Sequence, residues 1–209
     1  MIVVALVLVV LLAVLLPQMV RTKHSAVCIN NLKQVSLAHL LYRDDHQLAF
    51  YPGEVSTNEG GTLEYLKRGA LSEYFKRLTN EFLGAKALVC PSDHRKAARS
   101  FKTLGDSNLS YFVNADIGHL GGGLQPFNRV VIALGDRNVT NGTGPLARTI
   151  SVTQSNQLGW NKEMHNKGRR GSQPLLGNVA MIDGSVRTLT STGLQQAFNY
   201  EGSSRLVLP

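Results

Sequence analysis

The chain begins with a stretch that is apolar in every direction and continues with one that is apolar on a single side. Residues from Ile2 to Leu16 are all isoleucine, valine, alanine or leucine. From Arg21 to Asp45, apolar residues recur at helical spacing with no glycine or proline between them, as in an amphipathic helix. We therefore predict one helix of about 40 residues, kinked near Pro17 because proline lacks the backbone donor and its ring clashes with the preceding turn. The predicted buried stripe consists of Cys28, Leu32, Val35, Ala38 and Tyr42.

The rest of the chain predicts short helices followed by an antiparallel sheet. A loop opens at Tyr51-Pro52-Gly53, and residues 61–82 have apolar positions at helical spacing for one or two short helices. Beyond Cys90 the pattern changes to short apolar runs separated by glycine and asparagine turns, which is typical of strands. The apolar positions are Leu63, Leu66, Leu71, Tyr74, Phe75 and Leu78 for the helices, and Leu109-Tyr111-Val113, 130–134 and 178–189 for the strands.

The last part of the chain carries a hairpin signal. Asp183-Gly184 divides residues 178–189 into two strand-like runs, and an Asp-Gly pair between such runs favours a tight turn. Residues 192–198 predict a terminal helix, with Ser191 or Thr192 as its N-cap. Together these elements predict an α+β fold in which the N-terminal helix packs its buried stripe against an antiparallel β-sheet domain.

Length and charge limit the number of domains and the kinds of partner. The 209 residues, 22.8 kDa in mass, leave room for one ordinary domain plus an appendage. The formal net charge is +8, which favours anionic partners, but the basic residues are scattered and lack interleaved aromatics. We therefore predict a solvated surface and no nucleic-acid partner. The densest basic clusters are Arg21/Lys23, Arg95/Lys96/Arg99/Lys102 and Lys167/Arg169/Arg170.

No pattern in the chain indicates catalysis or a cofactor. The 6 histidines are dispersed, without the His-Glu-x-x-His spacing of metalloenzymes, and the chain has neither a Gly-x-Ser-x-Gly turn nor a phosphate loop. Asp93-His94 has two interpretations, half of a catalytic pair or a polar turn after Cys90-Pro91, and the turn needs no further partner. We predict that the protein is not an enzyme and needs no cofactor.

The apolar run fits a membrane segment better than a cleaved signal peptide. It is shorter than the roughly 20 residues that span a bilayer. However, no basic start precedes it and no small-x-small cleavage site follows it. We expect residues 1–20 to form the transmembrane or assembly part of the helix and residues 21–46 its amphipathic continuation. Residues 47–209 are expected to form a globular extracytoplasmic α+β domain.

Four segments resemble one known family, the prepilin-like proteins abundant in planctomycete and verrucomicrobial bacteria. LLPQMVRTKHSAVCINNLKQVSLAHLLYRDD (15–45) resembles their N-terminal helix, and 28–34 matches their Cys-x-Asn-Asn-Leu-Lys-Gln motif in full. Residues 90–93 and 110–114 resemble the second cysteine motif and the Ser-Tyr-x-x-Asn segment after it, and 177–186 the end of a His-x9-Asp-Gly box. The motif residues are Asn30, Asn31, Leu32, Lys33, Gln34, Pro91, Ser92, Asp93, Asn178, Asp183 and Gly184.

The chain departs from the family pattern in two places. Gln173 stands where the box has histidine, and the nearest histidine, His165, is out of register. The Gly-Phe-Thr-x-x-Glu recognition sequence of the prepilin peptidase is also missing. With Pro17 aligned on the family kink, Met1 falls immediately after the expected glutamate, so we expect Met1 to be an internal methionine or the chain to have been clipped there.

The resemblance implies a type IV pilin-like fold and a mechanical function. It implies a single-pass inner-membrane subunit with its globular domain in the periplasm or at the cell surface. Such a subunit is extracted by secretion or pilus assembly machinery and polymerises with other pilin or pseudopilin subunits into a type II secretion or type IV pilus-like fibre. Two alternatives stay open: an anchored, non-polymerising module that binds a glycan or an envelope protein, and a minor pilin that binds DNA.

Cys28 and Cys90 are the only cysteines, and the resemblance places both outside the cytoplasm. Oxidising conditions there favour one disulfide, worth roughly 4 kcal/mol for a loop of about 60 residues. Two buried free thiols are the alternative. A metal site is disfavoured because neither cysteine has a Cys-x-x-Cys or Cys-x-x-His partner.

Calcium is a further possibility that the resemblance raises. Some secretion pseudopilins bind Ca²⁺ through loop carboxylates, and Asp116, Asp136 and Asp183 are the candidates in this chain. No dense Asp-x-Asp-x-Asp run is present, so no metal site is predicted.

Overall fold

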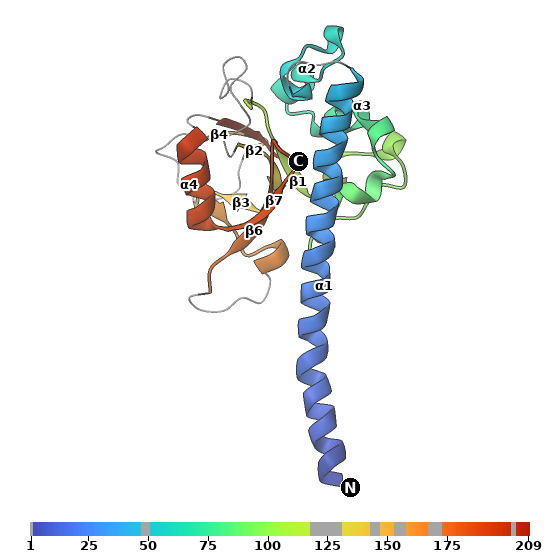
Figure 1. The fold of residues 1–209 in the computed structure, drawn as a ribbon, viewed down its shortest axis with the longest axis vertical. Helices are drawn as coiled ribbons and strands as arrows, with labels where there is room; N and C mark the ends of the chain where they lie inside the picture. Colours follow the sequence, from blue (N-terminus) through green and yellow to red (C-terminus); the bar gives the residue numbers. More distant parts are fainter. Residues whose placement is uncertain are drawn as a thin grey trace.

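A long helix runs along one side of a small α+β body and continues beyond it (Figure 1). The computed structural model describes residues 2–46, 51–117, 131–142, 147–152, 158–166, 173–201 and 204–209, without the side chains of residues 5, 14–24 and 199–201. The predicted kink at Pro17 and the basic clusters at Arg21/Lys23 and Lys167/Arg169/Arg170 lie outside the described side chains.

Helix α1, Ile2–Asp45, contains both parts of the predicted N-terminal helix. The whole predicted stripe, from Cys28 to Tyr42, is buried, which confirms the helical period. Ser36 and His39 are buried as well, so the contact face is wider than the apolar residues alone indicate. Among the residues that the structure describes, no helix combines the length and the hydropathy needed to cross a membrane.

Short helices cover the C-terminal end of α1. Helices α2, Leu63–Lys67, and α3, Leu71–Arg77, confirm the predicted pair, and the chain around them forms single 3-10 turns. The core residues Leu66, Tyr74 and Phe75 are buried. The 3-10 turns are Pro52–Glu54, Thr57–Glu59, Thr79–Glu81, Ala85–Leu88, Phe101–Thr103, Asp106–Asn108 and, farther on, Met164–Asn166.

The body is built on an antiparallel sheet of six strands in the order β4-β8-β1-β2-β6-β7. A second, two-stranded sheet pairs β3 with β5. The α+β class and the antiparallel pairing are as predicted. The strands are β1, Tyr111–Asn114; β2, Ile132–Asp136; β3, Val139–Thr140; β4, Thr149–Val152; β5, Gly159–Trp160; β6, Leu176–Met181; β7, Val186–Thr190; and β8, Ser204–Val207.

The large sheet separates two hydrophobic cores. Along β1, Tyr111 and Val113 join the core beneath α1, whereas Phe112 between them joins the core beneath the last helix, α4, Ser191–Glu201. This alternation follows from the two-residue period of a strand. The protein therefore has three layers: α1 with the short helices, the sheet, and α4 (Figure 1).

The C-terminal hairpin forms as predicted, whereas the cap of α4 differs. Gly184 adopts φ 85° and donates its N–H to Met181 O at 3.0 Å, closing the turn between β6 and β7. Helix α4 is capped by Thr190, whose Oγ1 accepts from Gly193 N at 3.0 Å. The predicted cap Ser191 instead accepts from the backbone of Trp160. Strands β4 and β8 carried no signal that singled them out.

Gly177 provides a test of the core beneath α4. A Cβ at Gly177 would lie 2.5 Å from the ring of Trp160, and that ring cannot retreat easily because its Nε1 donates to Leu189 O at 2.9 Å. Gly177→Ala should lower the free energy of unfolding by about 1–3 kcal/mol, the usual range for overpacking. Chemical denaturation measures it. Gly84→Ala, which meets open space, is the control and should stay within about 0.5 kcal/mol of wild type; equal effects would contradict this packing.

His39 provides a test of the interface between α1 and the short helices. Its Nδ1 donates to Val35 O at 2.6 Å, and burial lowers its pKa to about 4. The unfolded chain binds a proton near the ordinary histidine pKa of 6.5, so this group's contribution is complete above pH 6.5 and is lost as the pH falls toward 4. Between pH 6.5 and pH 4 the wild type should lose about 3 kcal/mol of unfolding free energy through this group. His39→Phe should not show this loss. Denaturation at several pH values measures it. The exposed His46 gives the control, His46→Phe, which should keep the wild-type profile.

Candidate functional site at the disulfide junction

The two cysteines join α1 to the body. Cys28 on α1 and Cys90, in the segment before β1, form a disulfide with Cα atoms 4.8 Å apart, and both side chains are fully buried. This confirms the predicted pairing and excludes two free thiols in this structure. The bond fixes the middle of a 44-residue helix to the body.

The Cys-x-Asn-Asn-Leu-Lys-Gln motif divides into residues that hold the junction and residues that face outward. Asn31 Nδ2 donates to Val89 O at 2.8 Å, one residue before the second cysteine. Leu32 is fully buried in the core. Asn30, Lys33 and Gln34 are not buried, so the folding of the body does not account for them.

The second cysteine motif forms a tight turn with a buried charge at its end. Asp93 N donates to Cys90 O at 2.9 Å, and proline at the second position, here Pro91, favours such a turn. The Asp93 side chain is fully buried and accepts from Arg137 Nε at 2.7 Å, Arg137 Nη2 at 2.8 Å and Ser110 Oγ at 2.9 Å. Burial alone would raise the pKa of Asp93, but the hydrogen bonds and charge of Arg137 outweigh it and lower the pKa to about 2.

Two arginines connect this turn to distant parts of the chain. Arg137, directly after β2, also pairs with Glu163 at 2.7 Å. Arg95 donates to the backbone carbonyls of Leu109, at 2.5 Å, and Pro209, at 3.2 Å. The charge of Arg95, in the densest basic cluster, is therefore used within the fold.

A histidine lies against the disulfide. His165 Nε2 is 3.6 Å from Cys90 Sγ and 3.2 Å from Oδ2 of Asp136, which is fully buried. Asn178, from the C-terminal motif, donates through Nδ2 to both Asp136 Oδ2 and His165 Nε2, each at 3.0 Å. Its Oδ1 accepts from Thr188 Oγ1 at 2.7 Å. The structure thus brings the asparagine of the C-terminal motif to the cysteine motifs.

The role of His165 was not visible in the sequence. Gln173, at the position of the family histidine, is exposed, whereas the out-of-register His165 lies at the disulfide. The only signal was that His165 is the nearest histidine before the Asp-Gly pair. Arg137 and Glu163 gave no signal, because Arg137 pairs with Asp93 and Glu163 across long stretches of sequence.

The three candidate calcium ligands occupy separate places. Asp116 accepts from Arg205 Nη2 at 2.7 Å, Asp136 lies beside His165, and Asp183 accepts from Ser185 N within the hairpin. Within the described part of the chain, they do not form a common group of ligands. Asp183 therefore has the turn-forming role that its Asp-Gly context predicts.

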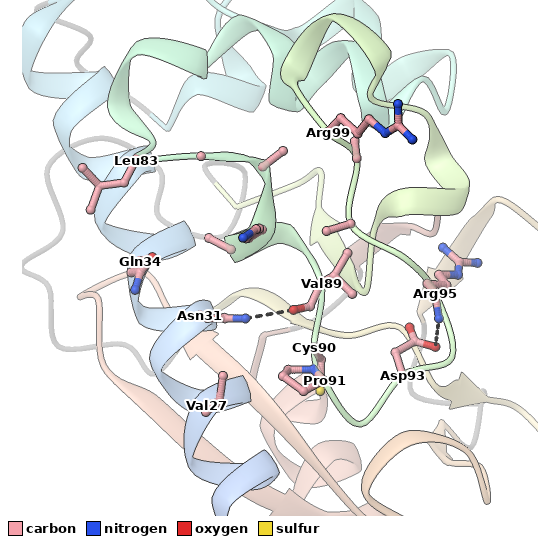
Figure 2. Close-up of a pocket in the computed structure, with 16 residues that line it drawn as sticks. Val27, Asn31, Gln34, Leu83, Val89, Cys90, Pro91, Asp93, Arg95 and Arg99 are labelled. Carbon is pink, nitrogen blue, oxygen red and sulfur yellow. Dashed lines mark hydrogen bonds between the residues drawn. The ribbon is translucent and has the colours of Figure 1, made fainter.

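A groove of about 890 Å³ runs between α1 and the segment that leads into and away from Cys90 (Figure 2). Val27, Asn31 and Gln34 of α1 line one side, and Leu83 projects from the other. The side chain of Leu83 is completely exposed. Arg99 lies at the far end. The groove therefore combines apolar walls with positive charge.

Comparison with known protein families, curated proteins and solved structures gives no match to this chain.

The Asp93–Arg137 pair makes a testable contribution to stability. Asp93→Asn should lower the free energy of unfolding by about 3 kcal/mol near neutral pH, because it leaves Arg137 largely buried without its main partner. The same contribution is present above the ordinary aspartate pKa of 3.8 and is lost as the pH falls toward 2. Chemical denaturation of the oxidised protein measures both effects.

A surface ion pair serves as the control for Asp93→Asn. Arg148 pairs with Asp106 at 2.8 Å but is mostly exposed, so Arg148→Ala should cost less than about 1 kcal/mol. If the two substitutions lower the free energy of unfolding equally, burial does not strengthen the Asp93–Arg137 pair.

Proposed function

We propose that this protein is a pilin-like or pseudopilin-like structural subunit that associates with other copies of itself through the N-terminal half of α1. The observation that supports the proposal is the exposure of this half. Every described large apolar side chain from Ile2 to Leu12 is between 50% and 80% exposed. Figure 1 shows this part of the helix extending beyond the body.

The distribution of this exposed surface favours a helical partner. The apolar residues occur all around the helix, and no charged or polar residue lies between Ile2 and Leu16. Such a helix is stable only when it is covered, and continuous exposed apolar surface of this kind marks an interaction site. Parallel copies of α1 offer the same surface along its whole length. Lipid would cover it before assembly, which is the basis for placing the subunit in the inner membrane.

The junction fits a subunit that carries load. The C-terminal half of α1 is held to the body by the Cys28–Cys90 disulfide, the Asn31 hydrogen bond and the buried stripe. A force along the helix is therefore passed to the body through a covalent bond. Because a disulfide persists in oxidising compartments, the body is proposed to lie in the periplasm or at the cell surface.

The groove favours a second candidate function, an anchored module that binds an envelope component without polymerising. Its apolar walls, the exposed Leu83 and the neighbouring Arg99 are suited to an anionic glycan or an acidic protein segment. Polymerisation requires contact between the N-terminal halves of α1 from different subunits, whereas an anchored binding module does not.

Cross-linking in lipid vesicles tests the association of α1. In the full chain with its native disulfide intact, Val7→Cys places one free thiol on the exposed apolar surface. Oxidation should yield covalent dimers whose fraction stays nearly constant as the vesicles are diluted with lipid. Adding Leu8→Lys should reduce the dimer yield more than about tenfold, because a buried unpaired charge costs well over 1.4 kcal/mol.

The matched control is Leu83→Lys in the same Val7→Cys background, which makes the same exchange on the body and should leave the dimer yield unchanged. A dimer fraction that falls in proportion to lipid dilution would identify random collisions of monomers and refute association through α1. Loss of dimers in the Leu83→Lys variant would instead place the contact on the body.

A further inference from the structure

Three side chains with metal-binding atoms meet at the junction from distant parts of the chain. Sγ of Cys28, Sγ of Cys90 and a ring nitrogen of His165 all lie within 4.8 Å of one another. Among the residues that the structure describes, this is the only group of at least three histidine, cysteine or acidic side chains so arranged. Spacing rules did not find it, because its third member comes from 75 residues beyond Cys90.

The positions of Cys90 and His165 already match neighbouring ligands of a tetrahedral ion. Cys90 Sγ and His165 Nε2 are 3.6 Å apart. Zinc binds a thiolate at about 2.3 Å and an imidazole at about 2.1 Å, which places the two atoms roughly 3.6 Å apart at a tetrahedral angle. Little movement of His165 is required for it to share an ion with Cys90.

Two polar side chains, Asn178 and Asp136, surround Nε2 of His165. Asn178 Nδ2 donates to Asp136 Oδ2, a carboxylate that can only accept, while its Oδ1 accepts from Thr188. The amide orientation is therefore fixed with Nδ2 toward His165 Nε2, at 3.0 Å. An ion at Nε2 would replace this contact, because a metal binds imidazole through the nitrogen lone pair.

Asp136 adds a charge that favours a cation. The side chain is fully buried, and its Oδ1 has no hydrogen-bond partner. An unpaired oxygen of this kind is costly in the protein interior. Asp136 Oδ2 lies 3.2 Å from the same nitrogen that would bind the ion, so the carboxylate places negative charge next to a cation held there.

We propose that reduction of the Cys28–Cys90 disulfide converts this junction into a site for one Zn²⁺ ion, bound by the two thiolates and His165 Nε2. A phosphine reductant supplies two electrons: the phosphine and one water become the phosphine oxide, and the disulfide becomes two thiols. Zinc binding then releases the two thiol protons to solvent. The net charge of the two thiolates balances the ion, and a water takes the fourth position. This site does not depend on the proposed assembly function.

The groove gives the reagents a path to the site. Cys90 and Pro91 line it, as Figure 2 shows, so solvent in the groove reaches the turn that covers the fully buried Cys90 side chain. The oxidised junction and the zinc-bound junction would hold α1 to the body in the same place. The protein therefore keeps its cross-link in both redox states.

Metal titration of the reduced full chain tests the proposal. The protein is treated with tris(2-carboxyethyl)phosphine without oxygen and titrated with Co²⁺, whose tetrahedral thiolate complexes absorb visible light, and then with Zn²⁺ in competition. One ion per chain should bind to the reduced wild type. His165→Gln should weaken binding by more than about 100-fold, because loss of even an outer partner costs roughly 10–100-fold. The oxidised protein should show no thiolate absorption.

The exposed His94 gives the matched control, His94→Gln, which should bind Co²⁺ like wild type. Circular dichroism follows the fold in the same titration. If the reduced chain loses structure, one equivalent of Zn²⁺ should restore it, since binding is coupled to folding. Equal affinity of His165→Gln and wild type, or no restoration of structure by Zn²⁺, would overturn the proposal.

Discussion

The attachment of α1 to the body at Cys28 holds the long helix against the sheet. The buried stripe determines which face of the helix meets the sheet, since each fully buried apolar side chain contributes about 1.5–3 kcal/mol. The disulfide adds roughly 4 kcal/mol by restricting the unfolded chain. The larger, distributed term therefore positions the helix, and the covalent bond prevents it from sliding or leaving.

Two groups of polar contacts lie beside this attachment and join segments that are far apart in the sequence. Asp93 anchors the turn after Cys90 through Arg137, at the end of β2. Asn178 of β6 connects Asp136 with His165 beside the disulfide. Because buried polar groups are costly unless they are paired, these contacts fix the relative positions of α1, the turn and the sheet. Asp136 Oδ1 has no hydrogen-bond partner.

Local sequence patterns predicted the elements that form from residues close together in the chain. The period of α1, the short helices and the Asp183-Gly184 turn each follow from residues close together in the chain. The place of β8 between β4 and β1 and the pairing of Asp93 with Arg137 did not follow, because they depend on contacts between segments that are far apart in the sequence. The cap of α4 differed by one position from the nearest prediction, because Ser191 bonds to the backbone of Trp160 and leaves the capping role to Thr190.

The candidate site also combines features that the sequence predicted with features that depend on distant segments. The pairing of the cysteines was predictable because the chain has only two. The residues beside them were not: His165 enters from a different segment, and sequence register pointed to Gln173. Of the motif residues, Asn31, Asp93 and Asn178 have structural roles at the junction. Asn30, Lys33 and Gln34 are not buried.

We propose that the N-terminal half of α1 is covered by other copies of the same helix. The distance between spin labels attached to Val9→Cys in isolated cell envelopes, with the disulfide left oxidised, tests this proposal. We expect strong dipolar coupling between labels on neighbouring subunits, which disappears when labelled chains are mixed with an excess of unlabelled ones. Labels that show no coupling before dilution would mean that α1 stands alone in the membrane, and would refute association through this helix.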